Sequence, residues 1–125
     1  MRKSELPRIT EAELVVMKLL WRENRPLSFK EIRTTLQAET EWKVSTIQTM
    51  LRRLCEKGAV EQHEHYVLIY TPNVTEAEYI GKETPAFVRR VFGGSAKRLV
   101  AALCEEGELT EDDLNELRQL LKEKG

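Results

Sequence analysis

The sequence predicts a mainly α-helical fold with one small β-hairpin, and three observations lead to this prediction. Four segments begin with Ser or Thr and carry Glu or Gln three residues later, which is the capping-box signature of a helix start. Apolar residues then recur every three to four positions, as on one face of a helix. After Gly58 the period becomes that of β-strands. Three short helices and a hairpin within about 65 residues are typical of a winged helix-turn-helix DNA-binding domain.

The first three predicted helices each carry one apolar stripe. The first begins after Thr10 and ends near Asn24, and the second begins at Ser28 and spans about three turns. The third is expected from Ser45 to Lys57, with Ser45 as its N-cap and Gly58 as the residue that ends it. The apolar stripes of the three helices are expected to meet in one core.

Two short strands are predicted after the third helix, over residues 59–64 and 66–71. The second is rich in β-branched and aromatic side chains, which favour strands. The turn between them, near Glu64 and His65, contains neither Gly nor Asn, so its type stays open. Pro72 is expected to end the second strand because proline lacks a backbone N–H group.

The rest of the chain is predicted to be helical in three pieces, over residues 75–92, 95–104 and 110–122. Pro85 lies inside the first piece, where it predicts a kink or a break. The pieces have apolar faces without a partner in so small a chain, so we expect them to pack against a second copy. The residues expected at this dimer contact are Tyr79, Phe87, Val91, Leu99, Leu103, Leu114, Leu117 and Leu121.

Charge divides the chain in the same way as the predicted elements. Residues 1–72, the expected winged-helix DNA-binding domain, carry 12 Lys and Arg against 10 Asp and Glu. Residues 73–125, the expected helical dimerisation region, carry 8 against 11, and the whole chain has a net charge of −1. Because the basic bias is slight, a prediction of nucleic-acid binding has to depend on where the basic side chains lie.

The polar face of the third helix is the candidate DNA-reading surface. A step of 100° per residue turns Ile47, Leu51 and Leu54 inward. Small polar side chains near the start of a helix can approach base edges, and arginine reaches guanine or phosphate. Lysine ahead of the helix, with the helix's own amides, can hold a phosphate. The residues on this face are Ser45, Gln48, Thr49, Arg52 and Glu56, with Arg53 at its flank and Lys43 just ahead of the helix. The alternative is an ordinary solvated helix surface.

Several stretches of the sequence also resemble one known protein family. Residues 9–17, residues 41–54, the sequence Tyr70-Thr71-Pro72 and the closing residues 116–121 resemble the penicillinase and methicillin-resistance repressor family (BlaI/MecI). The resemblance covers residues 9–122. It implies a bacterial homodimer that binds an inverted-repeat operator with its third helix in the major groove. It further implies DNA contacts by Lys43, Ser45, Thr46, Thr49 and Arg52, and a packing role for Trp42.

Three departures from that family pattern bear on regulation. The wing at residues 62–66 has no Lys or Arg, so we expect weak phosphate contacts there unless His63 and His65 take up protons. Family members in antibiotic resistance are inactivated by cleavage of an Asn-Phe bond, where this chain has Ala102-Leu103. A regulatory protease is therefore an open partner. Residues 120–125 lack the Cys-x-Cys pairs of copper-responsive relatives, so that mode of metal sensing is not expected.

Three other classes of function compete with the DNA-binding interpretation. An enzyme is not expected, because no nucleophile has a neighbouring base and no glycine-rich phosphate loop occurs. A metal- or pH-responsive regulator could use His63 and His65, which would share one face of a strand, with Cys55 or Cys104 as further ligands. A winged helix used only for protein contacts would leave the polar helix face idle. Operator binding itself is expected to require no cofactor.

The sequence also bears on location. No run approaches the roughly 18 apolar residues that span a bilayer, and no apolar signal-peptide core follows the basic N-terminus. A cytoplasmic protein without a membrane partner is therefore expected. Cys55 and Cys104 stand apart in the sequence, and in a reducing compartment a disulfide between them is not expected.

Overall fold

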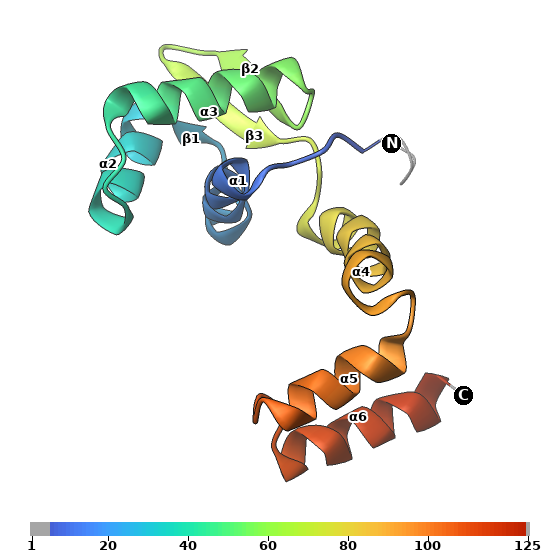
Figure 1. Cartoon of the computed structure of the whole chain (residues 1–125). Coiled ribbons are helices and arrows are strands. Elements are labelled where there is room, and N and C mark those ends of the chain that lie inside the picture. Colours follow the sequence, from blue (N-terminus) through green and yellow to red (C-terminus); the bar gives the residue numbers. More distant parts are fainter. Residues whose placement is uncertain (1–5, 125) are drawn as a thin grey trace. The chain divides into compact units, whose positions relative to one another are not determined.

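The computed structural model describes residues 6–124, which divide into two compact units, one ending at Lys82 and one beginning at Glu83. Figure 1 shows helices around a small sheet in the first unit and helices alone in the second. This confirms the predicted fold class. The elements are α1 (Glu11–Glu23), β1 (Leu27–Ser28), α2 (Phe29–Glu39), α3 (Val44–Glu56), β2 (Val60–Glu64), β3 (Leu68–Pro72), α4 (Glu76–Phe92), α5 (Ala96–Glu105) and α6 (Glu111–Lys124).

The predicted capping boxes of α1 and α2 are both present. Thr10 Oγ1 accepts a hydrogen bond from the Glu13 amide at 3.2 Å, and Glu13 Oε1 accepts one from the Thr10 amide at 2.9 Å. Ser28 and Glu31 exchange the same two bonds at the start of α2. Helix α1 ends at Asn24, as predicted, in the left-handed conformation with φ of 52°. These ends depend on contacts three or four residues apart, which local sequence specifies well.

The predicted start of α3 is wrong by two positions. Lys43, not Ser45, is the N-cap residue, so the expected Ser45 capping box does not form. The preceding turn is held by Thr40, whose hydroxyl accepts the Trp42 amide at 3.1 Å and donates to the Leu36 carbonyl. The chain therefore enters the helix before Ser45 is reached. Helix α3 ends as predicted, because Gly58 adopts a φ of 78° that disfavours residues with a side chain.

The hairpin forms part of a three-stranded antiparallel sheet in the order β1-β3-β2. Strands β2 and β3 pair Val60 with Pro72 and Glu64 with Leu68. The connecting loop therefore spans residues 65–67 and is longer than the predicted turn. Strand β1 was not predicted, because two residues are too few to show an alternating pattern. Its Leu27 lies opposite Tyr70 and is 2% exposed.

The core of the first unit lies between α1, α2, α3 and the sheet. Its most fully buried side chains include Val16, Met17, Leu19, Leu20, Leu27, Ile32, Leu36, Ile47, Leu54 and Val74. The apolar stripes of all three predicted helices therefore meet, as expected. Because α3 buries one side in this core, its opposite side is presented to solvent.

Helix α4 runs without interruption from Glu76 to Phe92 across Pro85, so no break occurs there. Proline removes one backbone hydrogen bond from a helix, and the rest of the helix has to compensate. Thr75 and Glu78 cap its start reciprocally at 2.9 and 3.0 Å. Near the same end the Tyr79 ring lies 5.7 Å from the Trp21 ring. These contacts anchor α4 ahead of the proline.

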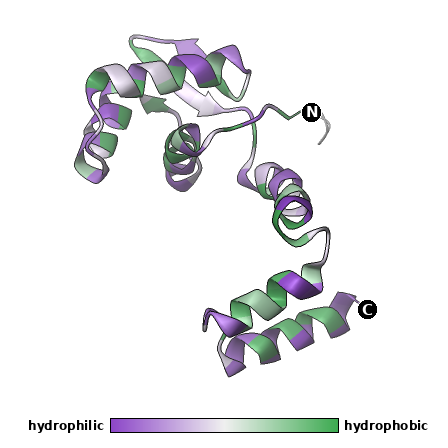
Figure 2. Cartoon of the chain, viewed as in Figure 1, coloured by the Kyte–Doolittle hydropathy of each residue, from purple (hydrophilic) through white to green (hydrophobic). Residues whose placement is uncertain are grey.

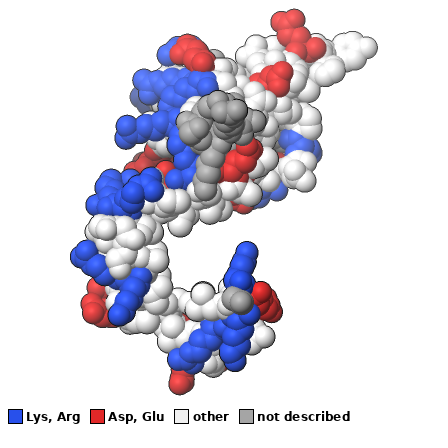
Figure 3. All heavy atoms as spheres, turned by 90° about the vertical axis from the view of Figure 1, so that its right-hand side faces the viewer, with Lys and Arg blue, Asp and Glu red and all other residues white. Residues whose placement is uncertain are grey.

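The second unit, as far as residue 124, buries only Val88. Its helices α5 and α6 run side by side in opposite directions (Figure 1), and Figure 2 shows hydrophobic residues along both. Figure 3 looks onto the end of this hairpin where α6 finishes, and Lys and Arg predominate there. The predicted start of α6 is confirmed, because Thr110 and Asp113 exchange capping bonds at 3.0 and 3.1 Å.

Two predictions about the whole chain can be compared with the described residues. Cys55 is half-buried and Cys104 is exposed, and both are free thiols. Within residues 6–124, no helix combines the length and the apolar character needed to cross a bilayer.

Candidate nucleic-acid interface

The polar face of α3 gathers all seven predicted DNA contacts on one helix and its N-cap. Ile47 and Leu54 are fully buried on the inner side and Leu51 is 3% exposed. On the outer side five of the seven are exposed and two are half-buried. The exposed ones are Lys43, Ser45, Gln48, Arg52 and Arg53, and the half-buried ones are Thr46 and Thr49. The core thus holds the helix in a single rotational setting, and this setting presents the polar side chains together.

The N-terminal end of α3 is open to an anion. No side chain caps this helix, which lies wholly within the described residues. The first amides that bond within the turn are those of Thr46 and Ile47, both to the Lys43 carbonyl at 3.0 and 3.2 Å. The amides of Val44 and Ser45 precede them at the positive end of the helix dipole. With the exposed Lys43 ammonium, they suit a phosphate oxygen.

Thr49 has a restricted choice of partners. Its hydroxyl donates to the Ser45 carbonyl at 2.9 Å, which uses the only proton of the side chain. Toward a ligand the oxygen can therefore only accept, and the side chain also offers a methyl group. In the major groove this combination suits the amino groups of adenine and cytosine, or the thymine methyl group.

Arg52 is free to reach outward. Its nearest acidic partner, Glu56, lies one turn along the helix, with Arg52 Nε 3.6 Å from Glu56 Oε1. The two side chains are 65% and 68% exposed, and an exposed pair of this kind is weak. A phosphate or guanine can therefore displace Glu56 at little cost. Arg53 is also exposed and lies in the last turn of α3, where its charge favours the helix dipole.

A groove of about 520 Å³ connects α3 with the hairpin. Gln48 and Arg52 of α3 and Gln62 of β2 all line it, and Gln62 is not among the predicted DNA contacts. Cys55 also lines the groove, and burial, with the nearby Glu56 carboxylate, raises the pKa of its thiol. Cys55 therefore stays protonated and packs against the core. No sequence pattern indicates Gln62, because Gln62 comes close to α3 only when the hairpin folds beside that helix.

The wing histidines do not share one strand face. His63 lies in β2, where its Nε2 is 2.9 Å from Thr71 Oγ1 on the neighbouring strand. His65 lies beyond the end of β2, in the loop that also carries the fully exposed Tyr66. The alternation of side chains along β2, which would place both imidazole rings on one face, therefore ends before His65. Within residues 6–124, no group of three His, Cys, Asp or Glu side chains is placed to hold a metal ion.

A buried ion pair holds α3 against α1, and sequence reasoning missed it. Glu13 is 1% exposed, and its Oε1 lies 2.5 Å from the Lys57 ammonium, which follows the end of α3. Lys57 also donates to the Arg8 carbonyl at 2.8 Å. Burial by itself raises the pKa of Glu13, but the hydrogen bonds from Lys57 and Thr10 outweigh it and lower the pKa. The capping role of Glu13 was visible in the sequence, whereas its partner 44 positions away was not.

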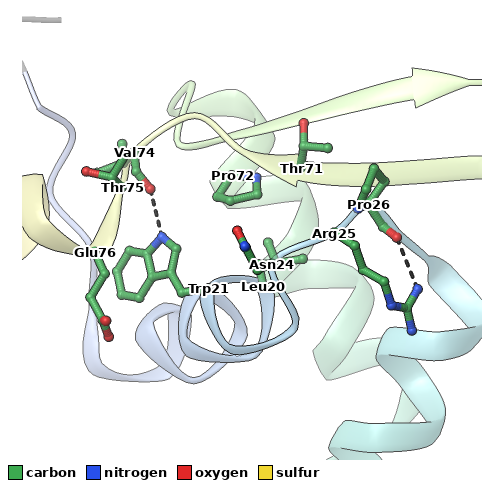
Figure 4. A pocket seen from close by; sticks show the side chains of 10 residues that line it. All are labelled: Leu20, Trp21, Asn24, Arg25, Pro26, Thr71, Pro72, Val74, Thr75 and Glu76. Atoms are coloured by element: carbon green, nitrogen blue, oxygen red, sulfur yellow. Dashed lines mark hydrogen bonds between the residues drawn. The ribbon is translucent and has the colours of Figure 1, made fainter.

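A second hollow, of about 470 Å³, lies between the end of α1, the end of β3 and the start of α4 (Figure 4). At one side the Trp21 indole donates to the Val74 carbonyl at 2.7 Å. At the other side Arg25 is paired with Glu31 at 2.7 Å. Since its strongest polar groups already have partners within the protein, this hollow contributes to folding and lies apart from the α3 face.

The predicted dimer residues divide between the two units. Tyr79 belongs to the first unit, where its ring packs on Trp21. The other seven belong to the second unit, where none is buried. Phe87, Val91, Leu117 and Leu121 are between 37% and 71% exposed. The division between units lies within α4, ten residues beyond the boundary drawn from the sequence.

Comparisons with known proteins agree with this arrangement. The penicillinase repressor family profile matches residues 9–123. The penicillinase repressor of Bacillus licheniformis is 38% identical over 120 residues, which cover 95% of this chain and 93% of that protein. The methicillin resistance regulatory protein MecI of Staphylococcus aureus (strain N315) is 29% identical over 117 residues, covering 93% of this chain and 94% of MecI.

A solved structure also matches part of the chain. The monomeric form of B. licheniformis BlaI, in complex with the blaP half-operator, aligns with a TM-score of 0.54 at 43% identity. The alignment covers 60% of this chain and 92% of that one. Because the family profile matches residues 9–123 and a penicillinase repressor is 38% identical over 95% of this chain, the chain belongs to the penicillinase repressor family.

Proposed function

We propose that this protein is a transcriptional repressor that binds a double-stranded operator through α3. The observation that carries the proposal is the polar α3 face, with its uncapped N-terminus and exposed arginines. Of the relatives that match nearly the whole chain, one is named as a repressor and one as a regulatory protein, and one related structure holds a half-operator. The proposal includes no catalytic step and no cofactor.

In this proposal α3 enters the major groove and the two ends of its polar face have different roles. Lys43 and the first amides of α3 hold a phosphate, which sets the position of the helix on the duplex. Ser45 and Thr49 then approach base edges, and Arg52 reaches guanine or the backbone. Between Gly58 and Gly81 the sequence has no Lys or Arg. The hairpin therefore supplies no Lys or Arg for phosphate, and α3 carries most of the phosphate contacts.

The proposed operator is an inverted repeat because the proposed repressor is a homodimer. The second unit exposes Leu117, Leu120 and Leu121. Apolar surface of this kind is stabilised when a second copy covers it. A two-fold dimer presents two α3 helices related by the same symmetry, and the DNA half-sites have to match that symmetry. Such a repressor acts in the cytoplasm, where the DNA is.

A regulatory protease remains a prediction, and the structure gives a physical condition for it. The Ala102-Leu103 bond lies inside α5, and both residues are half-buried. A protease requires an extended segment, so α5 has to unfold locally before this bond can be cut. Cleavage would then be governed by the opening of α5.

Arg52→Ala is expected to weaken binding to the duplex upstream of the protein's own gene. The loss is about 1–3 kcal/mol if Arg52 contacts a base, or about one unit of salt slope if it contacts a phosphate. Fluorescence anisotropy at several salt concentrations, with a random duplex of equal length beside the upstream one, measures both quantities. Arg22→Ala is the matched control, because Arg22 is an exposed arginine of α1 paired with Glu39.

Two results would count against this proposal in different ways. If Arg52→Ala leaves both affinity and salt slope at the wild-type values, Arg52 is not part of the interface. If the wild-type protein binds both duplexes equally and without salt dependence, the α3 face is idle. A winged helix used for protein contacts would then be favoured, and the exposed wing tip at Tyr66 and Val67 would be its contact.

A further inference from the structure

The turn between α4 and α5 is flanked by positive charge, with no negative charge in the adjoining sequence. Residues 84–104 contain four basic residues and no Asp or Glu. Arg89 and Arg90 lie in the last turn of α4, and Lys97 and Arg98 lie in the first turn of α5. All four are exposed. We call these four residues the basic corner, and Figure 1 shows the turn that joins the two helices.

Short contacts hold the two helix ends of the basic corner together. Gly93 and Gly94 adopt φ values of 59° and 88°, which glycine tolerates best, and they turn the chain from one helix into the next. The Arg98 guanidinium donates to the Phe92 carbonyl at 3.3 Å, so a side chain of α5 reaches the end of α4. The basic corner is therefore one surface built from two helix ends.

No ion pair within the chain neutralises the basic corner, as far as residues 6–124 are concerned. Every salt bridge that the structure shows among these residues belongs to the first unit. The Arg90 guanidinium lies over the Phe87 ring, 5.7 Å from its centre, and this partner carries no net charge. The charges of the basic corner are consequently available to an anion from outside the chain.

Helix stability explains only half of this charge. Cations at the end of a helix favour its dipole, which accounts for Arg89 and Arg90 in α4. Lys97 and Arg98 do the opposite, because they lie at the positive end of the α5 dipole. Repulsion among cations around one turn adds to this cost. A bound anion would remove both penalties, so the basic corner has the electrostatic character of a binding surface.

The basic corner is separate from the apolar groove of the second unit, which has a volume of about 340 Å³. This groove is lined by Val100 of α5 and by Leu114, Leu117, Arg118, Leu120, Leu121 and Lys124 of α6. No residue of the basic corner is among them. Substitutions in the basic corner can therefore be tested without changing the leucines of the proposed dimer contact.

We propose that the basic corner binds the sugar–phosphate backbone of the operator between its two half-sites, a segment called the spacer below. This inference rests on the proposed homodimeric repressor and adds a second DNA-binding surface to it. In that dimer the second unit carries the contact between copies, so it lies near the two-fold axis. The same axis passes through the middle of an inverted repeat. Duplex DNA carries about one charge per 1.7 Å, which suits several cations on flexible stems.

The first unit leaves phosphate contacts for a second surface to make. Its hairpin contains no Lys or Arg, so the proposed phosphate contacts of that unit come from α3. Phosphate contacts add affinity and salt dependence without reading the sequence. The basic corner therefore strengthens binding to a complete operator and leaves the choice of bases to α3. On an isolated half-site it contributes little, because the spacer is missing.

Uncharged phosphates in the spacer test this placement. Once footprinting has located the half-sites upstream of the protein's own gene, methylphosphonates replace the spacer phosphates, and fluorescence anisotropy measures binding of the full-length protein. Wild-type affinity is expected to fall about tenfold at low salt. In the triple variant Arg89→Gln, Arg90→Gln, Lys97→Gln, the same DNA change is expected to have little effect. Arg98 is kept because of its bond to the Phe92 carbonyl. Methylphosphonates at the outer ends of the duplex are the control and are expected to affect both proteins equally.

The salt dependence of binding tests the same contact on unmodified DNA. In the triple variant the slope of log K against log salt is expected to become shallower by at least about one unit. The double variant Arg89→Lys, Arg90→Lys keeps the charge and is expected to keep the wild-type slope, which a purely structural role of the arginines does not predict. The variant Lys18→Gln, Arg22→Gln, Lys122→Gln removes three exposed cations elsewhere and is the matched control, with an unchanged slope.

The possible outcomes separate this inference from the proposed function. If the wild type does not prefer the upstream duplex to a random one, the proposed repressor is wrong and the inference with it. If it does, but the uncharged spacer leaves its affinity unchanged or weakens the triple variant equally, the basic corner does not bind the spacer. A triple variant with the wild-type salt slope also overturns the inference and favours an acidic protein as partner. A triple variant whose mass in sedimentation falls overturns it too, because the corner then supports the dimer instead.

Discussion

Leu117→Asp is expected to convert the proposed dimer into monomers. Leu117 lines the apolar groove of the second unit and is 37% exposed in the single chain. By symmetry the substitution places two carboxylates in the covered interface. Burying polar groups without partners costs about 1–3 kcal/mol each, so we expect the dimer to weaken by roughly 2–6 kcal/mol. The mass in solution, measured by sedimentation, is expected to fall to that of one chain.

The same variant is expected to lose operator affinity while keeping its DNA-reading helix. Each monomer then binds one half-site independently, and the gain from joining two sites disappears. Binding to a half-site duplex is expected to stay at the wild-type level, because α3 belongs to the first unit.

The matched control for Leu117→Asp is Gln119→Asp. Residue 119 is exposed on α6, it does not line the groove, and the substitution adds the same charge. A dimer of unchanged mass in Leu117→Asp would show that the groove is not the interface. Dissociation in both variants would show that added negative charge, rather than the apolar contact, is responsible.

Lys57→Met is expected to lower the free energy of unfolding by about 3 kcal/mol, because it leaves the Glu13 carboxylate buried without its cation. The value lies at the lower end of the range for broken buried pairs, since the Lys57 side chain is itself 31% exposed. Urea unfolding measured by tryptophan fluorescence reports this change, because Trp21 and Trp42 both belong to the first unit.

Glu13→Gln is the matched comparison and is expected to be milder. Glutamine keeps the capping bond to the Thr10 amide, and the freed Lys57 ammonium can turn into solvent. In the double variant Glu13→Gln, Lys57→Met, part of the loss is expected to be recovered, because no unpaired charge stays buried. Equal losses of unfolding free energy in Lys57→Met and Glu13→Gln would contradict this prediction, because they would show that an unpaired Glu13 costs no more than an unpaired Lys57.

The Glu13–Lys57 pair also predicts a pH dependence with a definite sign. Because the pKa of Glu13 is lowered in the folded protein, its stabilisation is present above the ordinary glutamate pKa. It is lost as pH falls through the folded pKa. In Lys57→Met the contribution of Lys57 that lowers the pKa of Glu13 is absent, so the unpaired carboxylate takes up a proton at a higher pH than in the wild type. The stability gap between wild type and Lys57→Met is therefore expected to narrow on acidification, and a widening gap would contradict the assignment.

The helix starts show which local features of the fold can be predicted from the sequence. The capping boxes at Thr10 and Ser28 could be predicted because each involves residues three positions apart. The Ser45 pattern has the same spacing and fails, because Thr40 shapes the turn before α3. The missing capping box matters for the proposed function, because the amides of an uncapped helix N-terminus are available to hold a phosphate. Composition alone could not distinguish these cases.

The sequence by itself determined the helices, the hairpin and the polar face of α3, because all of these arise from neighbours along the chain. The tertiary structure decided which distant residues meet. Strand β1 exists only because Leu27 lies beside Tyr70, and Glu13 became a structural ion pair only when α3 ended against α1. The physical reason is the distance along the chain. Periodicity and capping arise from contacts between residues within about one helical turn, which the local sequence shows. Burial and charge pairing depend on contacts between residues far apart in the sequence, which only the folded chain brings together.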